Sequence, residues 1–491
     1  MIAGNPKRPS CPIVPDRQGH PARVVGWFEG WNVYRPYTGS GDCPAGRPSR
    51  ITPWMYTHLN FAFAHVHPST FEIAMAREGD RFLYHDLVYL KEYNEDLKVY
   101  ISITPWDMYH EGMDGKQSTF SSLVGSEKYQ KKFFQSLKAF IKATGFDGVD
   151  VYWPYPGVEA HGGRSKDHEN FAVFIERLRE ALEKNDKKRS GLTVTLPLDH
   201  ERLQGFDLKQ LEPHVEFFNT VPQRPSADVS TVAKALEEHR SLAKVVTALD
   251  GFWSQGISPE KVTLALSLGI HTFHLSNPGC SDASCEIVGY GEPTSCSSGV
   301  GNMWRGEAKR LSGFWDPWTN SPADDKDHSY QKRSILLRNT PEQLKQDIEL
   351  AQSLCLGGVS LWGGLGDGYV QQSLVDPLRE KLGMRQVDSV TDSAYFAFLL
   401  GAHTSYLDFV NMGTPDHAHQ PTDPVLPMSC QGRRAKGHRA EDLARLCVKR
   451  YKYNYKRVVP DNPSARDPLG HGSGRGYIVT APPRDMPLAA R

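Results

Sequence analysis

Short apolar runs alternate with longer stretches of helical periodicity along most of the chain. Residues 56–64 are almost continuously apolar, which is typical of a parallel strand buried on both faces. Residues 128–144 instead repeat apolar side chains at helical spacing. We expect strands at Arg23–Trp31, Tyr56–Ala64, Leu97–Ile103, Asp147–Pro156, Leu192–Leu196, Val215–Val221, Lys261–Leu268 and Gly357–Trp362. This rhythm predicts an α/β fold in which a parallel sheet closes into a (β/α)8 TIM barrel.

The helical patterns and the remaining segments set the expected domain boundaries. We expect helices near 86–93, 128–144, 168–184, 229–255 and 341–354, the last with Thr340 at its N-cap and Pro341 at N1. Residues 1–22 are predicted to be a disordered leader, and 23–385 the barrel. The segment of about 270–338 after strand seven is much longer than an ordinary βα loop, so we expect it to be an irregular insertion. Residues 386–491 are predicted to be a C-terminal extension of low order.

Composition narrows the class of protein. The 491 residues are 39% hydrophobic and 23% charged with zero formal net charge, so no global field favours nucleic acid or an anionic membrane. No apolar run is long enough for a transmembrane helix, and residues 1–18 do not resemble a signal peptide. The basic and aromatic run 449–457 could indicate polyanion binding, but a solvated run is the preferred interpretation.

Eight cysteines suggest disulfide bonds rather than a metal site. Cys280, Cys285 and Cys296 lie in a loop rich in Gly, Ser and Pro, and with Cys43 they are the disulfide candidates. This usage favours an oxidising, extracellular location, although the connectivity cannot be read from one sequence. Cys355 ends an apolar helix and is predicted to be a buried free thiol. No metal or cofactor is expected.

The segment Asp147–Pro156 carries the chemistry. Alternation along a strand would place Asp150, Tyr152 and Pro154 on one face. The segment resembles the motif Asp-Gly-x-Asp-x-Asp-x-Glu, followed by Tyr-Pro, of glycoside hydrolase family 18, the chitinases. Further segments resemble family motifs in the same order, namely Gly26–Trp31, Leu59–Phe63, Ser102–Trp106, Glu216–Asn219 and Gly357–Trp362. The cysteine-bearing segment 273–301 is most similar to fungal class V chitinases of the killer-toxin-like subgroup.

The resemblance implies a mechanism whose key residues are missing. In this family the N-acetyl oxygen of the substrate attacks the anomeric carbon, and the Glu that ends the motif is the general acid. Pro154 stands at that position and Tyr152 at that of the Asp before it, so Asp147 and Asp150 remain as structural groups. The segments 221–224 and 269–271 also lack the family's polar contacts to the sugar. Glu29 and Glu159 are the candidate replacement acids.

Aromatic residues remain where barrel sites are built. Trp31, Trp106, Tyr155 and Trp362 fall at predicted carboxyl ends of strands and could stack on sugar rings, whereas Trp153 is predicted to pack inside the protein. We therefore expect a monomeric barrel that binds chitin or an N-acetylglucosamine glycan without hydrolysing it, and that binds neither nucleic acid nor membrane. An active endo-chitinase with a displaced acid and a decayed gene product without glycan function are the alternatives.

Overall fold

The computed structural model describes most of residues 23–383. The described residues are 23–34, 46–105, 119–184, 189–222, 225, 228–280, 282–294, 296–297, 299–308, 315–316, 321–322, 334–365 and 374–383. All of them belong to one of the two compact units into which the chain divides. The predicted leader, the C-terminal extension and the run 449–457 lie outside the described residues, so the domain boundaries remain predictions.

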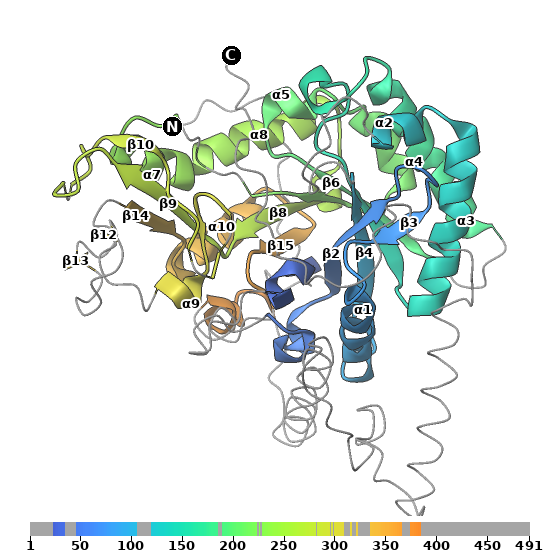
Figure 1. The fold of residues 1–491 in the computed structure, drawn as a ribbon, viewed down its shortest axis with the longest axis horizontal. Coiled ribbons are helices and arrows are strands. Elements are labelled where there is room, and N and C mark those ends of the chain that lie inside the picture. Colours follow the sequence, from blue (N-terminus) through green and yellow to red (C-terminus); the bar gives the residue numbers. More distant parts are fainter. Residues whose placement is uncertain are drawn as a thin grey trace, which may run out of the picture. The chain divides into compact units, whose positions relative to one another are not determined.

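Parallel strands form a closed barrel, as predicted (Figure 1). Each strand pairs with its neighbours in parallel, and β1 closes the barrel by pairing with both β2 and β15. The barrel strands are β1 (Arg23–Glu29), β2 (His58–Val66), β4 (Lys98–Thr104), β5 (Gly148–Tyr152), β6 (Gly191–Leu196), β7 (Phe218–Thr220), β8 (Val262–Ser267) and β15 (Gly358–Trp362). A short strand, β3 (Ile73–Met75), adds antiparallel to β2. The apolar runs become strands buried on both faces, and β6 is buried throughout.

Helices follow the strands and cover the barrel. They are α1 (Asp80–Tyr89), α2 (Thr119–Val124), α3 (Glu127–Thr144), α4 (Asp167–Glu183), α5 (His200–Leu203), α6 (Leu208–Leu211), α7 (Val232–Arg240), α8 (Leu242–Ser254), α9 (Arg305–Ala308) and α10 (Pro341–Ser353). The predicted start of the last helix is confirmed, because Thr340 and Gln343 form a capping box with Pro341 at N1. Helix α3 ends at Thr144, and its C-cap Gly145 has a positive φ of 84°, which suits a residue without Cβ.

The insertion is a second sheet rather than an irregular loop, which corrects the prediction. Its strands are β9 (Ile270–Leu275), β10 (Ile287–Tyr290), β11 (Asn302–Met303), β12 (Trp315–Asp316), β13 (Ser321–Pro322) and β14 (Ser334–Arg338). Phe273 and Leu275 on β9 pack with Ile335 and Leu337 on β14 and with Val232 of α7. Figure 1 shows β9, β10 and β14 beside α7. Alternate apolar side chains of β9 and β14 form a small core. This pattern is hard to recognise in the sequence because a segment rich in Gly, Ser and Pro separates the two strands.

Candidate functional site

Asp150 lies at the centre of the barrel, surrounded by neutral hydrogen-bond donors. Its carboxylate accepts hydrogen bonds from Ser102 Oγ at 2.6 Å, Thr193 Oγ1 at 2.7 Å and Asn219 Nδ2 at 3.2 Å. Thr195 Oγ1 lies 2.9 Å from both carboxylate oxygens. These donors come from β4, β6 and β7, the strands that follow or flank β5. Complete burial raises the pKa of the Asp150 carboxyl, against the opposing effect of these hydrogen bonds.

Tyr152, two residues further along β5, belongs to an aromatic cluster at the carboxyl end of the barrel. Its ring stacks on Phe63 with centroids 5.7 Å apart, and its edge approaches Trp362 at 6.5 Å. Trp27 stacks on Trp362 at 3.8 Å, and Trp31 on Phe63 at 5.8 Å. We call these five rings the aromatic mouth. Burial raises the pKa of the Tyr152 phenol above its ordinary value of 10, so the ring is uncharged at neutral pH.

The predicted sugar-contacting residues differ in their exposure and contacts. Trp31 is 37% exposed at the rim, and Trp362 is half-buried within the mouth. Tyr155 is set apart from these rings, because His161 stacks on it at 3.9 Å and the Arg202 guanidinium lies 5.9 Å from its centroid. Trp106 lies outside the described residues. Sugar contact by any of the four therefore remains a prediction.

The described residues near Pro154, which stands at the position of the family's general acid, offer few proton donors. Pro154 is buried two residues after the end of β5. Glu159 is exposed in the short 3-10 helix Glu159–His161, beyond the end of β5. Glu29, the last residue of β1, accepts hydrogen bonds from the Asn32 side chain and from the Gly364 N–H at 3.3 Å. Glu29 is therefore held at the mouth by its neighbours, and Glu159 lies in the loop beyond it.

Asp147 lies at the opposite, amino-terminal end of β5. Its carboxylate forms an ion pair with Lys91 Nζ at 2.9 Å and accepts the Val99 N–H at 3.0 Å. Its backbone pairs with both neighbouring strands, through Val99 and Gly191. These contacts join β4, β5 and β6 at the amino-terminal end of the barrel, so Asp147 stabilises the start of the strand and does not reach the mouth.

The cysteines follow the prediction in part. Cys280 is joined to Cys285 by a disulfide in the loop between β9 and β10. Cys296 and Cys355 are also disulfide-bonded, so the prediction that Cys355 is a free thiol is wrong. A residue at the end of an apolar helix is not necessarily buried in the core. Cys355 follows α10 with a positive φ of 60° and is only partly buried. Cys43 lies outside the described residues.

Among the described residues, one group of three potential metal ligands lies close together. It consists of Cys280, Asp282 and Cys285. The two sulfur atoms are bonded to each other, so the thiolates that a metal ion would need are not present. No helix in the described part of the chain is long and apolar enough to cross a bilayer.

Sequence reasoning did not identify the groups that surround the site. The donors to Asp150 come from Ser102, Thr193, Thr195 and Asn219, and the mouth also includes Trp27 and Phe63. The available signal was the alternation of Thr193 and Thr195 within an otherwise apolar strand. Polar side chains at every second position of a buried strand indicate a common partner inside the barrel.

Comparison with known proteins places this geometry in a context. Chitotriosidase-1 of Mus musculus is 23% identical over 358 residues, which are 70% of this chain and 73% of that protein. The oviduct-specific glycoprotein of Sus scrofa is 25% identical over 294 residues, and the chain spans only 52% of its length. A structure described as "Human YKL-39 is a pseudo-chitinase with retained chitooligosaccharide binding properties" has a TM-score of 0.56 at 20% identity, covering 74% of this chain and 99% of that one.

The family match agrees with the extent of the barrel. At 20% identity the YKL-39 structure supports the fold alone. The model of glycosyl hydrolases family 18 matches residues 23–365, which begin at β1 and end just after β15. Both the closed parallel barrel and the match cover the same strands, so the chain belongs to glycosyl hydrolases family 18.

Proposed function

We propose that the protein binds chitin or a related N-acetylglucosamine glycan at the aromatic mouth without hydrolysing it. The observation that carries the proposal is the combination of a retained aromatic mouth with Pro154 at the position of the family's general acid. The proposal rests on two separate arguments, one against hydrolysis and one for binding.

The argument against hydrolysis concerns protons and charge. Proline has no titratable group, so Pro154 cannot protonate a leaving oxygen. Tyr152 stands where the family has an Asp that stabilises a cationic intermediate, and its buried phenol stays neutral. Loss of general acid catalysis alone costs about 10²–10⁴-fold in rate. Asp150 remains, but its oxygens are already used by hydroxyl and amide donors.

The argument for binding concerns the exposed rings. Trp31 is exposed at the rim and Trp362 is half-buried, and both stack on other rings that hold them in place. Rings fixed in this way lose little conformational entropy when a ligand stacks on them. Human YKL-39, a structure with the same fold, is described as a pseudo-chitinase with retained chitooligosaccharide binding. That description supports the proposal that this fold binds glycans without turnover.

The proposal includes the protein's extracellular location and its relation to a subgroup of the family. The Cys280–Cys285 disulfide supports an oxidising, extracellular compartment. The cysteine-bearing segment 273–301 is the basis for proposing a relation to fungal class V, killer-toxin-like members. We propose that the protein acts as a monomer.

Retention on insoluble chitin tests the binding proposal. The wild type is expected to bind, and Trp362→Ala to bind at least about tenfold more weakly, because truncation of an aromatic anchor costs more than about 1.4 kcal/mol. Trp54→Ala is a matched control: Trp54 is also half-buried, but it precedes β2 at the other end of the barrel and donates to Tyr93 O. Failure of the wild type to bind any chitin oligomer would remove the proposal.

One observation keeps hydrolysis as a second candidate. Glu29 is a carboxylate at the carboxyl end of β1, where barrel enzymes place their catalytic groups. If Glu29 replaced the missing acid, turnover of a fluorogenic N-acetylglucosamine oligomer would be measurable and would be lost in Glu29→Gln. A folded wild type without turnover eliminates this candidate.

A further inference from the structure

A pocket of about 270 Å³, lined mostly by residues with polar or charged side chains, lies at the amino-terminal end of the barrel, away from the aromatic mouth. The segments that enter β2, β4, β5, β6 and β7 form its wall, which includes His58, Lys98, Tyr100, Arg189 and Glu216. The volume is just below the roughly 300–1,000 Å³ of drug-sized ligand sites, so an occupant would be a small molecule. Barrel enzymes react at the other end, which favours binding over chemistry here.

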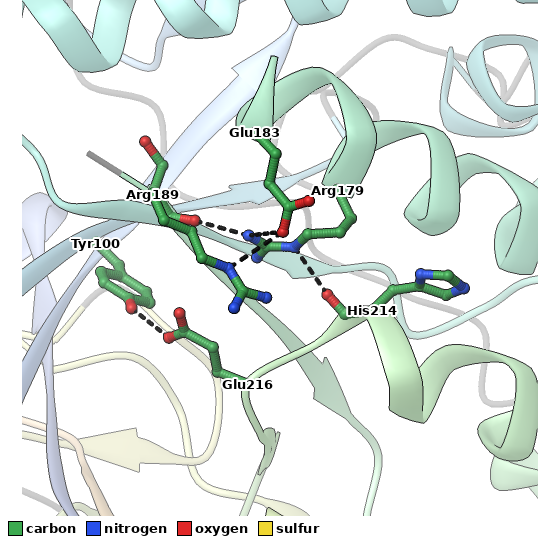
Figure 2. Close-up of polar contacts among 7 residues, drawn as sticks. Tyr100, Arg179, Glu183, Arg189, His214 and Glu216 are labelled. Atoms are coloured by element: carbon green, nitrogen blue, oxygen red, sulfur yellow. Dashed lines mark hydrogen bonds and ion pairs between the residues drawn. The ribbon is translucent and has the colours of Figure 1, made fainter. Parts of the chain in front are cut away.

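Tyr100 lies in the wall of the pocket and donates a hydrogen bond to Glu216. A Cβ at position 191 would collide with the Tyr100 hydroxyl, so Gly191 leaves the space through which the phenol passes. Tyr100 Oη then donates to Glu216 Oε2 at 2.6 Å, as Figure 2 shows. Burial and the nearby carboxylate raise the pKa of Tyr100 above its ordinary value, so the phenol remains a donor.

The other acids of the wall do not require an external partner. Asp147 is paired with Lys91 at 2.9 Å and accepts the Val99 N–H. Asp96 is exposed at the rim, where solvent screens its charge. The acidic side of the pocket is therefore either internally paired or hydrated.

The basic side retains unused donors. Lys98 makes no side-chain hydrogen bond or ion pair with any described residue. Arg189 uses its Nε for Glu183 at 3.2 Å, and its Nη atoms contact no described acceptor. Figure 2 shows this guanidinium between Glu183 and the Tyr100–Glu216 pair. Arg179 Nη2, on α4, is buried without an acceptor among the described residues. Donors therefore exceed acceptors on this wall.

His58 adds no positive charge to the wall of the pocket. His58 lies in the wall with its Nδ1 2.9 Å from Thr57 Oγ1. Burial, and then the positive charges of Arg23 and Lys98, lower the pKa of His58 to about 4, against a smaller opposing effect of Asp147. The imidazole is neutral at pH 7, so the cations of the wall are Lys98 and Arg189.

We propose that this pocket binds a small anion through a carboxylate or phosphate group held between Lys98 Nζ and the Arg189 Nη atoms. A guanidinium and an ammonium together supply charge and directed N–H donors, which both anions accept. The site is separate from the aromatic mouth and does not depend on glycan binding. An anion bound there would stabilise the folded barrel, because it binds the native pocket and not the unfolded chain.

Calorimetric titration of the full chain tests the proposal. Inorganic phosphate and succinate are the two probes, and sodium chloride at equal ionic strength controls for general salt effects. We expect saturable one-site binding of at least one probe and a rise in melting temperature with that probe. Lys98→Gln and Arg189→Gln should each weaken binding by about tenfold or more, since each removes a charged hydrogen bond. The probe that binds more tightly distinguishes phosphate from carboxylate.

Lys128→Gln is the matched control, because Lys128 is exposed on α3, away from the pocket wall. It should bind the probe as the wild type does. If neither probe binds the wild type saturably up to millimolar concentration, the proposal is overturned, whatever the variants do. Equal weakening in Lys128→Gln would also overturn it, by showing a general charge effect.

Discussion

Buried carboxylates at the two ends of the barrel have different kinds of partners. At the amino-terminal end the buried carboxylate of Asp147 is paired with the Lys91 ammonium. At the carboxyl end Asp150 meets only neutral hydroxyl and amide donors, and Asp80, at the start of α1, accepts from the Tyr34 hydroxyl and the Arg77 backbone N–H. Burial raises the pKa of both Asp150 and Asp80.

This difference bears on function. A barrel hydrolase concentrates charged, titratable groups at the carboxyl end, where the loops form the active site. Here the buried carboxylate with an ion-pair partner, Asp147, lies at the other end, and the carboxyl end holds stacked rings around a carboxylate that is fully hydrogen-bonded. Such an arrangement suits the stacking of a ligand on rings better than proton transfer. The predictions below test this contrast, from the largest expected effect to the smallest.

Replacement of Asp150 by alanine should have the largest effect. The change leaves the donors of Ser102, Thr193 and Asn219 buried without an acceptor, at about 1–3 kcal/mol for each unsatisfied group. We expect a loss of more than about 3 kcal/mol in the free energy of unfolding, measured by urea titration. Asp150→Asn should lose less, because the hydroxyl groups can rotate to suit the amide.

Glu169→Ala is the control for this change, since Glu169 is exposed on α4. If Asp150→Ala were no less stable than Glu169→Ala, the carboxylate would not organise the barrel interior. A melting curve without a cooperative transition in the wild type would instead favour the decayed gene product.

Asp80 should make stability depend on pH. Burial raises the pKa of Asp80 from 3.8 to about 6. The folded state thus holds a proton that the unfolded chain has released, so the stabilisation is complete below pH 3.8 and is lost as the pH rises through about 6. Asp80→Asn cannot titrate at this position. Between about pH 3.8 and 6 the wild type should therefore lose up to about 3 kcal/mol more unfolding free energy than this variant does. Urea unfolding at several pH values measures the difference; parallel curves would contradict it.

Restoration of the family's motif should have the smallest effect. Tyr152→Asp with Pro154→Glu supplies both carboxylates, but it removes the ring that stacks on Phe63 and places an acid at a buried position. The segments 221–224 and 269–271 still lack the family's contacts, and Ile270 and His271 now form part of β9. We expect turnover of a chitin oligomer to stay at the wild-type level. Recovery to ordinary chitinase rates would show that the two positions alone control activity.

Much of the barrel could be predicted because its strands are local apolar runs. The eighth strand was expected at Gly357–Trp362 and forms at Gly358–Trp362. The strand expected at Val215–Val221 forms only at Phe218–Thr220. Val215 and Phe217 are buried, as their apolar side chains predict, but they lie outside the strand. Burial and strand pairing are separate properties, and an apolar pattern reports only the first.

The surroundings of the site could not be predicted because they depend on contacts between distant segments. Trp27 lies beside Trp362 because β1 and β15 pair with Gly26 opposite Leu361 when the barrel closes. The donors to Asp150 likewise depend on the register in which Ser102 and Thr193 both lie opposite that residue. A single sequence gives the strands but not this register.

The most direct test of the central claim measures binding and turnover together on one sample of the full, folded chain. A chitin oligomer is titrated into the protein by calorimetry, and the same mixture is then followed for release of shorter oligomers. We predict saturable binding, weakened at least about tenfold in Trp362→Ala, with no release of products above the uncatalysed background. Product release that disappears in Glu29→Gln, or no binding at all by the wild type, would contradict the account.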